Sequence, residues 1–536
     1  MEMNFKGLQD KAAFGEIGVK LPRFDWERMC EKSRKAPVWV HFGAGNIFRG
    51  YIAGLQQKLL DDGVSACGIV AVDTSAELIR DVYHAYDNMT MLVGLKPDGS
   101  TDNEVIASVS EAIKADSADA LAWERLSEIF MCAGLQMVSF TITEKGYALF
   151  DAQGQIFPLV AEDIANGPSM PRHGMAMVAA LMYKRFTKGE APISLVSMDN
   201  CSHNGDKLKE SILTIARGWQ EKGYVSKEFV SYLDDQNKVS FPVSMIDKIT
   251  PRPSAEISAQ LAALGIKGMK LIKAGANFYI APFVNAEIPE YLIIEDRFPN
   301  GRPPLEKAGV YLTDRETVNM TERMKVTTCL NPLHTALAVY GCLLGYVSIA
   351  DEMKDKELKA LVERIGYAEG MPVVTDPRII APMEFIKEVI ESRLPNPFIP
   401  DTPQRIAEDT SQKVPIRFGE TIKAYLSQKE LKIDDLIGIP LALAGWLRYL
   451  LAVDDEGNEM ALSPDPMLDE LKSHLSGISL GDVDSIADKL KAVLSNKVIF
   501  GTDLYKAGMG EKIERLFGEL IEAPGAVRST LKKYLC

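Results

Sequence analysis

Residues 37–50, PVWVHFGAGNIFRG, join a short apolar run to a turn that contains glycine. The run PVWVHF has the length and composition of a buried strand, and a helical pattern follows the glycines up to residue 63. A second apolar run, CGIVAV, ends at Asp73. A strand, a glycine turn, a helix, a second strand and an acid make up a Rossmann unit, in which the glycines let the backbone approach a pyrophosphate at a helix N-terminus. This order predicts a dinucleotide-binding domain in the first half of the chain.

The match to the Rossmann fingerprint is partial. Gly43 and Gly45 stand at the first two glycine positions, but Phe48 replaces the third glycine. The glycine pair is also compatible with an ordinary turn, and Asp73 with a turn residue or an N-cap before the segment TSAELIR that follows it. An acid at the end of the second strand binds ribose hydroxyls and repels a 2′-phosphate. Because no arginine stands beside Asp73, we expect NAD(H) rather than NADP(H) as the cofactor.

Two later apolar runs also end in polar residues. LQMVSFTIT at 135–143 leads into Glu144, and PISLVSMDN at 192–200 ends in Asn200. In open parallel sheets, ligands bind outside the carboxyl ends of the strands, so we expect these clusters at the ligand crevice. Ordinary polar loops between helices and strands remain the alternative. The residues expected to contact the cofactor are Gly43, Gly45, Asn46, Phe48, Arg49, Asp73, Thr143 and Glu144.

The chain of 536 residues is too long for one hydrophobic core, so more than one domain is expected. Proline and glycine cluster in YLIIEDRFPNGRPP at 291–304, which predicts a boundary near residue 300. We expect a Rossmann-type, doubly wound α/β domain over residues 1–300, with an N-terminal extension over 1–35. Residues 301–536 show helical periodicity and no convincing strand after residue 310. An all-α domain is therefore predicted there, with a cleft between the two domains.

The composition argues against several classes of partner and location. The net charge of −14 would repel a nucleic acid or an anionic membrane surface. No run of about 18 apolar residues is present, so no transmembrane segment is expected, and the N-terminal stretch does not resemble a secretory signal. The seven cysteines form no CxxC pair and their number is odd, which fits a reducing cytoplasm. No cysteine and histidine spacing predicts a metal site.

The segment KVTTCLNPLH at 325–334 brings a lysine, an asparagine and a histidine to the start of an apolar helix. The structural interpretation is a solvated Lys325, an Asn331 that caps the helix and a His334 that is satisfied in the core. The functional interpretation is a proton-transfer site. A lysine serves as a base only if its pKa falls toward neutrality, which burial and a nearby cationic ring both promote. An amide donor can stabilise charge that develops on a reacting oxygen.

Several phrases of the chain resemble the polyol-specific long-chain dehydrogenases, the mannitol dehydrogenase family. LPRFDWE and VHFGAGNIFRG are similar to the family's opening, and TITEKGY, SMDNCSHNG, SFPVSMIDKITP and IIEDRFPNGRPP follow in a fixed order. KVTTCLNPLHTALA is similar to the family's catalytic segment, and RLPNPFI and IAEDTSQKVPIR extend the similarity toward the C-terminus. The resemblance therefore covers nearly the whole chain.

The resemblance implies a metal-independent dehydrogenase or reductase with a Rossmann domain and an α-helical C-terminal domain. It makes Lys325 the general acid and base, and it makes Asn331 and Asn200 the residues that hold the reacting oxygen. His334 would orient the substrate. The further residues that we expect at the substrate are Asp247, Arg393 and Lys413.

Two departures from the family's pattern affect the catalytic segment. Five residues separate Lys325 from Asn331, one more than in the family, and Pro332 stands where the family has glycine. Proline is favoured at the first helical position, so Asn331 is also a candidate N-cap of the next helix. A bulge in the turn or helix before Asn331 would absorb the extra residue.

The resemblance leaves several substrates open. The leading expectation is interconversion of D-fructuronate and D-mannonate, and the alternatives are a mannitol or arabinitol 2-dehydrogenase and a tagaturonate reductase. If the substrate is a uronate, a cation should meet its carboxylate, with Arg393 as the first candidate and Lys413 as the second. A charge at a helix C-terminus is the structural alternative for Arg393. A nucleotide-binding sensor and a decarboxylating dehydrogenase are the other classes considered, and a monomer or weak homodimer is expected.

Overall fold

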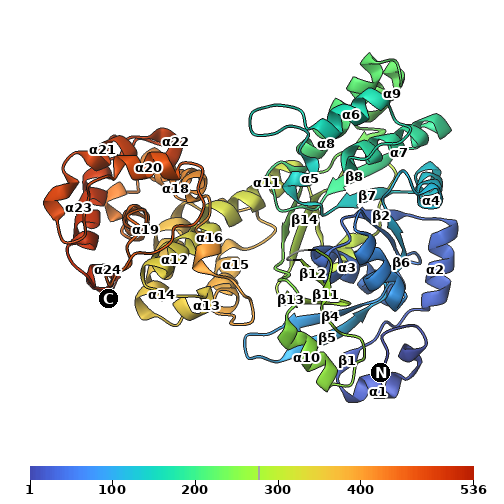
Figure 1. The fold of residues 1–536 in the computed structure, drawn as a ribbon, viewed down its shortest axis with the longest axis horizontal. Helices are drawn as coiled ribbons and strands as arrows, with labels where there is room; N and C mark the ends of the chain where they lie inside the picture. Colours follow the sequence, from blue (N-terminus) through green and yellow to red (C-terminus); the bar gives the residue numbers. More distant parts are fainter. Residues whose placement is uncertain (276–277, 536) are drawn as a thin grey trace. The chain divides into compact units, whose positions relative to one another are not determined.

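The structure of the protein is a computed structural model that describes residues 1–275 and 278–535 (Figure 1). Two compact units divide between Val318 and Asn319. All β-strands of the described residues lie in the first unit, and the second unit is helical. Helix α11 (Arg315–Met324) runs across the division.

The centre of the first unit is a six-stranded, fully parallel sheet. Its strand order is β6-β3-β2-β7-β8-β9, so the chain starts in the middle, winds outward on one side and then winds outward on the other. This is the doubly wound order of a Rossmann fold, and the direction of winding reverses between β2 and β7. The expected fold class is confirmed for this half of the chain. The strands are β2 (Trp39–Phe42), β3 (Ile69–Asp73), β6 (Val109–Lys114), β7 (Met137–Phe140), β8 (Ile193–Ser197) and β9 (Val239–Ser240).

Each face of this sheet packs against its own apolar cluster. Along β2, Val40 and Phe42 enter one cluster and Trp39 enters the other, as the alternation of side chains along a strand dictates. His41 shares the face of Trp39, and its ring nitrogens lie 2.6 Å from Ser139 Oγ and 2.8 Å from Thr141 Oγ1. Burial lowers the pKa of His41 to about 3, so this ring is neutral. The three longest helices that contribute to the first cluster are α4 (Ala120–Met131), α7 (Gly174–Gly189) and α8 (Asn204–Glu221), and α5 (Thr143–Tyr147), α6 (Pro158–Asn166) and α9 (Lys227–Asp234) also contribute to it.

The helix that follows the glycine turn approaches a second sheet closely. It begins as a π-helical turn, η2 (Phe48–Ile52), and continues as α3 (Ala53–Asp61). A Cβ on Gly50 would stand 2.9 Å from Val284 Cγ1, so a larger side chain would push the two elements apart. Gly50 thus provides the close packing of helix and sheet that the third glycine of the fingerprint provides in other Rossmann folds.

Three smaller sheets complete the first unit. The second sheet, in the order β1-β5-β4-β13, contains β1 (Val19–Lys20), β5 (Thr101–Ile106), β4 (Thr90–Leu95) and β13 (Phe283–Glu287). The third contains β10 (Ser244–Asp247), β14 (Tyr291–Glu295) and β15 (Tyr311–Thr313), and the fourth contains β11 (Ile272–Lys273) and β12 (Tyr279–Ile280). The expectation that no strand follows residue 310 is wrong for β15, because three residues are too few to show a period of two.

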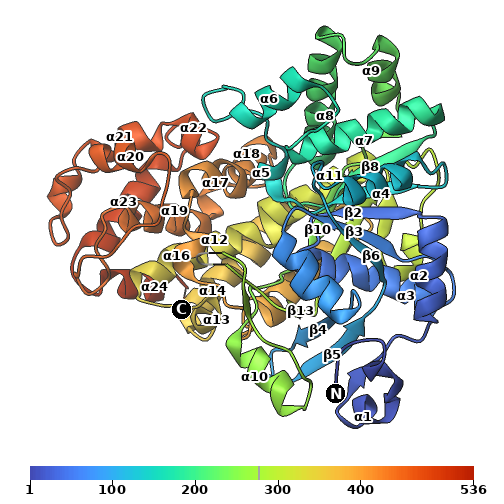
Figure 2. The same ribbon diagram turned by 45° about the vertical axis from the view of Figure 1, so that its right-hand side comes forward.

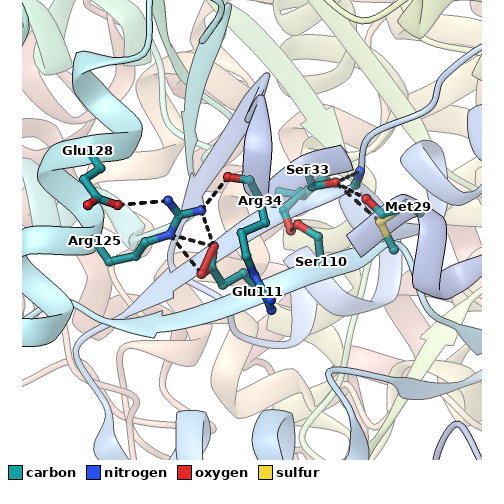
Figure 3. A network of polar contacts seen from close by, with 9 residues as sticks. Met29, Ser33, Arg34, Ser110, Glu111, Arg125 and Glu128 are labelled. Atoms are coloured by element: carbon teal, nitrogen blue, oxygen red, sulfur yellow. Dashed lines mark hydrogen bonds and ion pairs between the residues drawn. The ribbon is translucent and has the colours of Figure 1, made fainter. Parts of the chain in front are cut away.

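Hydrogen bonds join the N-terminal extension to the edge of the central sheet, as Figure 3 shows. Arg125 of α4 donates to Glu111 of β6 at 3.0 Å and to the carbonyl of Arg34 at 3.1 Å, where α2 (Trp26–Lys35) ends. Ser33 of α2 accepts a hydrogen bond from the backbone of Gly68, just before β3, at 2.8 Å. The other helical segments of the first unit are η1 (Gly7–Gln9), α1 (Lys11–Glu16), η3 (Leu78–Tyr83), η4 (His84–Tyr86), α10 (Ala255–Ala263) and η5 (Leu305–Ala308).

The second unit is built around two buried helices, α12 (Asn331–Leu343) and α19 (Gly438–Tyr449), which Figure 2 shows in its interior. Every residue of α12 is buried except Asn331 and His334, so the apolar sequence predicted this central position correctly. Because the described residues of this unit form no strand, the expected helical class is confirmed. The other helices are α13 (Ile349–Glu352), α14 (Lys356–Glu363), α15 (Pro382–Glu388), α16 (Pro403–Ile406), α17 (Thr410–Arg417), α18 (Gly419–Ser427), α20 (Leu468–His474), α21 (Lys489–Leu494), α22 (Lys497–Phe500), α23 (Gly510–Ile521) and α24 (Ala526–Leu535).

Candidate active site

A cavity of about 390 Å³ lies at the carboxyl ends of β2, β3, β6 and β7, next to the point where the winding of the sheet reverses. Doubly wound sheets bind their ligands at this position. Four of the predicted cofactor residues line the cavity, namely Gly43, Gly45, Asp73 and Thr143. Strand ends that are distant in the sequence therefore meet at one crevice, as expected for a dinucleotide site.

The two glycines at this cavity have different reasons to be glycine. Gly43 has φ +89°, and a Cβ there would stand 2.1 Å from the carbonyl oxygen of Thr141. A Cβ on Gly45 would meet no protein atom within 4 Å, although Gly45 lines the cavity. Gly43 therefore makes the tight turn, whereas Gly45 leaves space in which a ligand can approach the backbone. These are the roles of the first two glycines in a dinucleotide fingerprint, so the residues fit the expected cofactor.

Asp73 connects the end of β3 to the glycine turn. One of its carboxylate oxygens accepts the backbone N–H of Ala44 at 2.8 Å, and the other accepts the N–H of Ser75 at 2.9 Å. Burial raises the pKa of Asp73, and these backbone donors oppose the rise. The contact with Ser75 makes Asp73 a turn residue, and the cap of the helix that begins at Ala76 is Ser75, whose hydroxyl accepts the N–H of Leu78 at 3.1 Å. The Asp73 carboxylate also lines the cavity, so this turn contact is compatible with ribose binding.

The remaining predicted cofactor residues lie outside the cavity lining. Phe48 is buried and stacks on His41 at 4.3 Å between ring centroids. Arg49 is buried and donates to the carbonyl of Ala281 at 2.7 Å and to Asn46 Oδ1 at 2.9 Å. Glu144 forms an ion pair with Lys207 near the surface. These side chains stabilise the loops around the cavity.

The N-terminus of α7 forms one wall of the cavity, and its residues were not among the predicted site residues. Residues His173, Gly174, Met175 and Met177 line the cavity together with the glycine turn. The ring of His173 caps α7 by accepting the N–H of Met175 at 3.3 Å. Burial lowers the pKa of His173, so its ring is neutral near pH 7. The phrase PRHGM, with a proline and a capping residue before a glycine, is the signal that marks a helix start here.

Asp199 joins two of the phrases on which the sequence analysis relied. Its carboxylate accepts the N–H groups of Ile142 and Thr143 at 2.9 Å each and the hydroxyl of Tyr147 at 2.6 Å. Burial raises the pKa of Asp199, while these donors favour its charged form. The loop after β7 is thereby fixed to the end of β8. Asn200 is the next residue, and Asp247, the other candidate from this unit, is buried at the end of β10.

Lys325 lies at the start of a π-helical turn, η6 (Lys325–Cys329), between α11 and α12. The N–H of Leu330 donates to the carbonyl of Lys325 at 3.1 Å, which closes a ring one residue longer than that of an α-helix. This is the bulge that the extra residue before Asn331 requires. Only 2% of Lys325 is exposed, so the interpretation of a solvated lysine is wrong and the burial that an acid–base role needs is present.

Asn331 is the first residue of α12, and the N-cap position belongs to Leu330. The backbone carbonyl of Asn331 accepts the hydroxyl of Thr335 at 3.0 Å. Within the described part of the chain its carboxamide makes no hydrogen bond, so the interpretation of Asn331 as a cap is wrong. The carboxamide is therefore available to a ligand.

His334 stands one turn further along α12, beside an aspartate that the sequence analysis did not identify. His334 Nε2 lies 2.9 Å from Asp401 Oδ2, and only 16% of the histidine side chain is exposed. The two atoms are close, but the contact does not have the geometry of a well-aligned hydrogen bond. Arg405 binds the other oxygen of Asp401. Burial would raise the pKa of Asp401, but His334 and Arg405 outweigh it and lower the value.

The two predicted cations have different surroundings in the second unit. Arg393 is buried at the end of another π-helical turn, η9 (Val389–Arg393). Lys413 lies in α17, where its ammonium donates to the carbonyls of Ile406, at 3.1 Å, and Glu408. Burial lowers the pKa of Lys413, and the neighbouring Arg417 lowers it further. Arg417 was not predicted as a site residue, although it contacts Asn331 and Thr335.

The described residues contain neither a metal-ligand cluster nor a membrane-spanning helix. No three histidine, cysteine, aspartate or glutamate side chains come together there in a way that could hold a metal ion. No helix of the described chain has both the length and the apolar character needed to cross a membrane.

Comparisons with known proteins match both units. Residues 37–307 match the mannitol dehydrogenase Rossmann domain, and residues 317–520 match the mannitol dehydrogenase C-terminal domain. D-mannonate oxidoreductase of Thermotoga maritima is 53% identical over 99% of both chains. D-mannonate oxidoreductase of Escherichia coli is 28% identical over 91% of this chain and 93% of its own. The solved ternary complex of Pseudomonas fluorescens mannitol 2-dehydrogenase with NAD and D-mannitol has a TM-score of 0.70 and 26% identity over 99% of both chains.

Proposed function

We propose that this chain, which belongs to the mannitol dehydrogenase family, is an NAD(H)-dependent oxidoreductase that interconverts D-fructuronate and D-mannonate. The observation that carries this proposal is the 53% identity to a D-mannonate oxidoreductase over essentially the whole of both chains. An oxidoreductase that acts on a CH–OH group accounts for both a Rossmann domain and a buried lysine beside an amide and an imidazole.

The cavity of the first unit would hold the cofactor. Gly45 gives the pyrophosphate access to the backbone, and the Asp73 carboxylate accepts hydrogen bonds from ribose hydroxyls. The bound nicotinamide supplies or accepts the hydride. A structure of the mannitol 2-dehydrogenase relative contains NAD, which supports the same cofactor here.

Lys325 would move the proton of the reaction. In the oxidation of a secondary alcohol, its neutral amine takes the hydroxyl proton, and in the reduction of a ketone its ammonium returns that proton. The resemblance assigns the carboxamides of Asn331 and Asn200 to the reacting oxygen, where one well-placed donor is worth roughly 3–4 kcal/mol. His334 would hold a second hydroxyl of the substrate and so fix its orientation.

A polyol 2-dehydrogenase is the second candidate. The solved relative that binds NAD and D-mannitol supports it, because that protein resembles this chain over its whole length. A tagaturonate reductase uses the same chemistry on an isomeric uronate and is the third. All three activities require the same lysine. The two uronate substrates carry a carboxylate, and the polyol does not.

A substrate panel tests the proposal directly. The purified chain is mixed with D-fructuronate, D-tagaturonate or D-fructose and NADH, or with D-mannonate, D-mannitol or D-arabinitol and NAD⁺, and absorbance of the reduced cofactor is followed. The highest kcat/KM is expected with D-fructuronate. A higher kcat/KM with D-fructose or D-mannitol would favour the polyol enzyme, and a higher kcat/KM with D-tagaturonate would favour the tagaturonate reductase. No reaction with any compound would reject all three candidates.

We also propose that the enzyme acts in the cytoplasm as a monomer or a weak homodimer. The odd number of cysteines and the absence of CxxC pairs support a reducing compartment. Light scattering coupled to gel filtration at two protein concentrations measures the association directly. A stable assembly larger than a dimer at the lower concentration would contradict the proposed state.

A further inference from the structure

Arg417 is a half-buried arginine, and no acidic side chain among the described residues pairs with it. It ends α17, and its Nη1 donates to Thr335 Oγ1 at 2.5 Å and approaches the backbone carbonyl of Asn331 at 3.5 Å. Burial alone lowers the pKa of Arg417 to about 10, and no acidic side chain opposes this effect. Among the described residues, Arg417 forms no ion pair.

The buried arginines elsewhere in the chain use more of their donors. Arg185 donates through Nε, Nη1 and Nη2 to five backbone carbonyls, and Arg448 donates through the same three nitrogens to three. Arg417 uses Nη1 alone within the described chain, which leaves Nε and Nη2 without a protein acceptor. These two atoms are not sealed from solvent, so a ligand can reach them. Charge that is shielded from water is normally paired in proteins, so this edge of the guanidinium is suited to bind an anion.

The Nε and Nη2 edge of Arg417 is close to the residues of the proposed chemistry. Arg417 contacts Asn331 and Thr335, which belong to the same first turn of α12 as His334. Lys413 lies one turn earlier on α17 and adds positive charge, although its ammonium is held by backbone carbonyls. A planar carboxylate fits the Nε and Nη2 edge of a guanidinium with two parallel hydrogen bonds.

We propose that Arg417 binds the carboxylate of the sugar-acid substrate through Nε and Nη2, an inference that rests on the proposed function. Arg417 is then the residue that makes a uronate a better substrate than a neutral ketose. This role differs from that of a clamp between α17 and α12, and from that of a cation that interacts with the C-terminal end of α17. If Arg417 had either structural role, its substitution would change the KM of charged and of neutral substrates equally.

The test compares one charged and one neutral substrate in matched variants. Arg417→Met removes the charge and Arg417→Lys keeps a charge without the planar fork. Lys423→Met is the control, because it removes an exposed cation of α18 that pairs with Glu420. Steady-state reduction of D-fructuronate and of D-fructose by NADH is measured for each protein.

Arg417→Met should raise the KM for D-fructuronate by about 10- to 150-fold, the worth of a charge-assisted pair, and the KM for D-fructose less than about threefold. Arg417→Lys should fall between Arg417→Met and the unmodified chain, and Lys423→Met should match the unmodified chain. Equal changes for both substrates, or no change, would overturn the inference. Arg393→Met is measured alongside. If Arg393→Met loses the preference for the uronate and Arg417→Met does not, Arg393 and not Arg417 binds the carboxylate.

A binding measurement keeps this inference separate from the proposed reaction. The unfolding temperature of the full chain with NAD⁺ is recorded with D-mannonate and with D-mannitol. D-mannonate should raise it more than D-mannitol, and Arg417→Lys, the variant more certain to fold, should reduce that difference. If the chain reduces neither ketose, the proposed function fails, but the difference between the two ligands still decides the role of Arg417. Equal stabilisation by both ligands in the unmodified chain would reject that role.

Discussion

Lys325 shows at the scale of one residue how burial separates two interpretations of the same sequence. As a solvated lysine it would have its ammonium in water, but only 2% of the residue is exposed. Burial disfavours a charged ammonium, and this is the condition under which a lysine can exchange a proton near neutral pH. The sequence identified the residue through its spacing to Asn331 and His334, while its environment depends on packing that the spacing does not contain.

Lys325→Ala is expected to lower turnover by about 10²- to 10⁴-fold, the usual contribution of a positioned acid or base. Because the lysine acts on the proton, the dissociation constant of NADH should stay near its original value. In the unmodified enzyme alcohol oxidation should rise with pH, and ketone reduction should fall over the same range. Stopped-flow turnover and fluorescence titration with NADH measure both quantities. Nearly full turnover in the variant would remove Lys325 from the mechanism.

Asp73 sets the expected choice between the two nicotinamide cofactors. Its carboxylate accepts hydrogen bonds from ribose hydroxyls and repels a 2′-phosphate, so kcat/KM should be higher with NADH than with NADPH. Asp73→Ala should narrow this gap, and it should also loosen the glycine turn, since Asp73 accepts the N–H of Ala44. Asp73→Asn keeps an acceptor for that N–H and separates the two effects. Equal kcat/KM with both cofactors in the unmodified enzyme would contradict the assignment.

At the scale of elements, π-helical turns recur where predicted site residues stand. The described residues form five π turns. Three of them, η2, η6 and η9, contain Phe48 and Arg49, Lys325, and Arg393 respectively, whereas η3 and η7 (Arg364–Gly370) contain no predicted site residue. A π turn adds one residue to a helical turn and so changes the direction of the side chains around it. Such turns are frequent at functional sites. Composition carries no signal for them. Only the comparison of spacing with the family's catalytic segment indicated the bulge before Asn331.

Glu352 at the end of α13 is a buried carboxyl group that packs against α12. Neither carboxylate oxygen has a hydrogen-bond partner in the described chain, and a Cβ on Gly341 would overlap the Glu352 side chain. Burial first, and then the charges of Asp401 and Asp355, raise the pKa of Glu352 to about 9. The unfolded chain releases this proton near pH 4.5, so between pH 4.5 and about 9 only the folded state holds it. Stability contributed by this group therefore falls as the pH rises through that window.

Glu352→Gln should therefore stabilise the protein increasingly as the pH rises. The gain over the unmodified chain should grow by about 1.4 kcal/mol per pH unit between pH 5 and pH 8, because the amide has no proton to release. Chemical unfolding of both proteins at several pH values measures it. Glu363→Gln, on the solvated side of α14, is the control that should show no such trend. A gain that is the same at pH 5 and pH 8 would mean that Glu352 is ionised in the folded state.

The first turn of α7 is expected to contact the adenosine half of the cofactor, since it faces the cavity beside Asp73. His173→Asn keeps an acceptor for the cap of α7 but removes the ring from the cavity wall. It should weaken the binding of NADH and of ADP-ribose by about tenfold, equivalent to ~1.4 kcal/mol. Binding of nicotinamide mononucleotide and the unfolding temperature should be unchanged. Equal weakening of the binding of ADP-ribose and of nicotinamide mononucleotide would mean that His173 does not contact the adenosine half specifically.

At the scale of the whole molecule, the sequence predicted the elements that depend on neighbouring residues. It did not predict the contacts between residues that are distant in the chain. The strands β2 and β3 and the helix α12 follow from apolar patterns of a few residues. The pairing of β13 with β4 joins residues 283–287 to residues 91–95, and no local pattern specifies such a partner. The contact of Asp401 with His334 and the cavity wall formed by His173 are of the same kind. Site residues within the quoted phrases were therefore predicted, and their partners were not.

The π-helical turn before Asn331 has a consequence for insertions and deletions of single codons. In an α-helix each residue advances the side chains by about 100°, so losing one residue inside α12 would rotate its buried face out of the core. Losing one residue within 326–329 would instead shorten the π turn to an α turn and leave four residues between Lys325 and Asn331, the family's spacing. The orientation of α12 in the core would be retained. We therefore expect the protein to tolerate the loss of one codon at this position, next to the lysine. The same loss inside α12 would disrupt the packing of that helix.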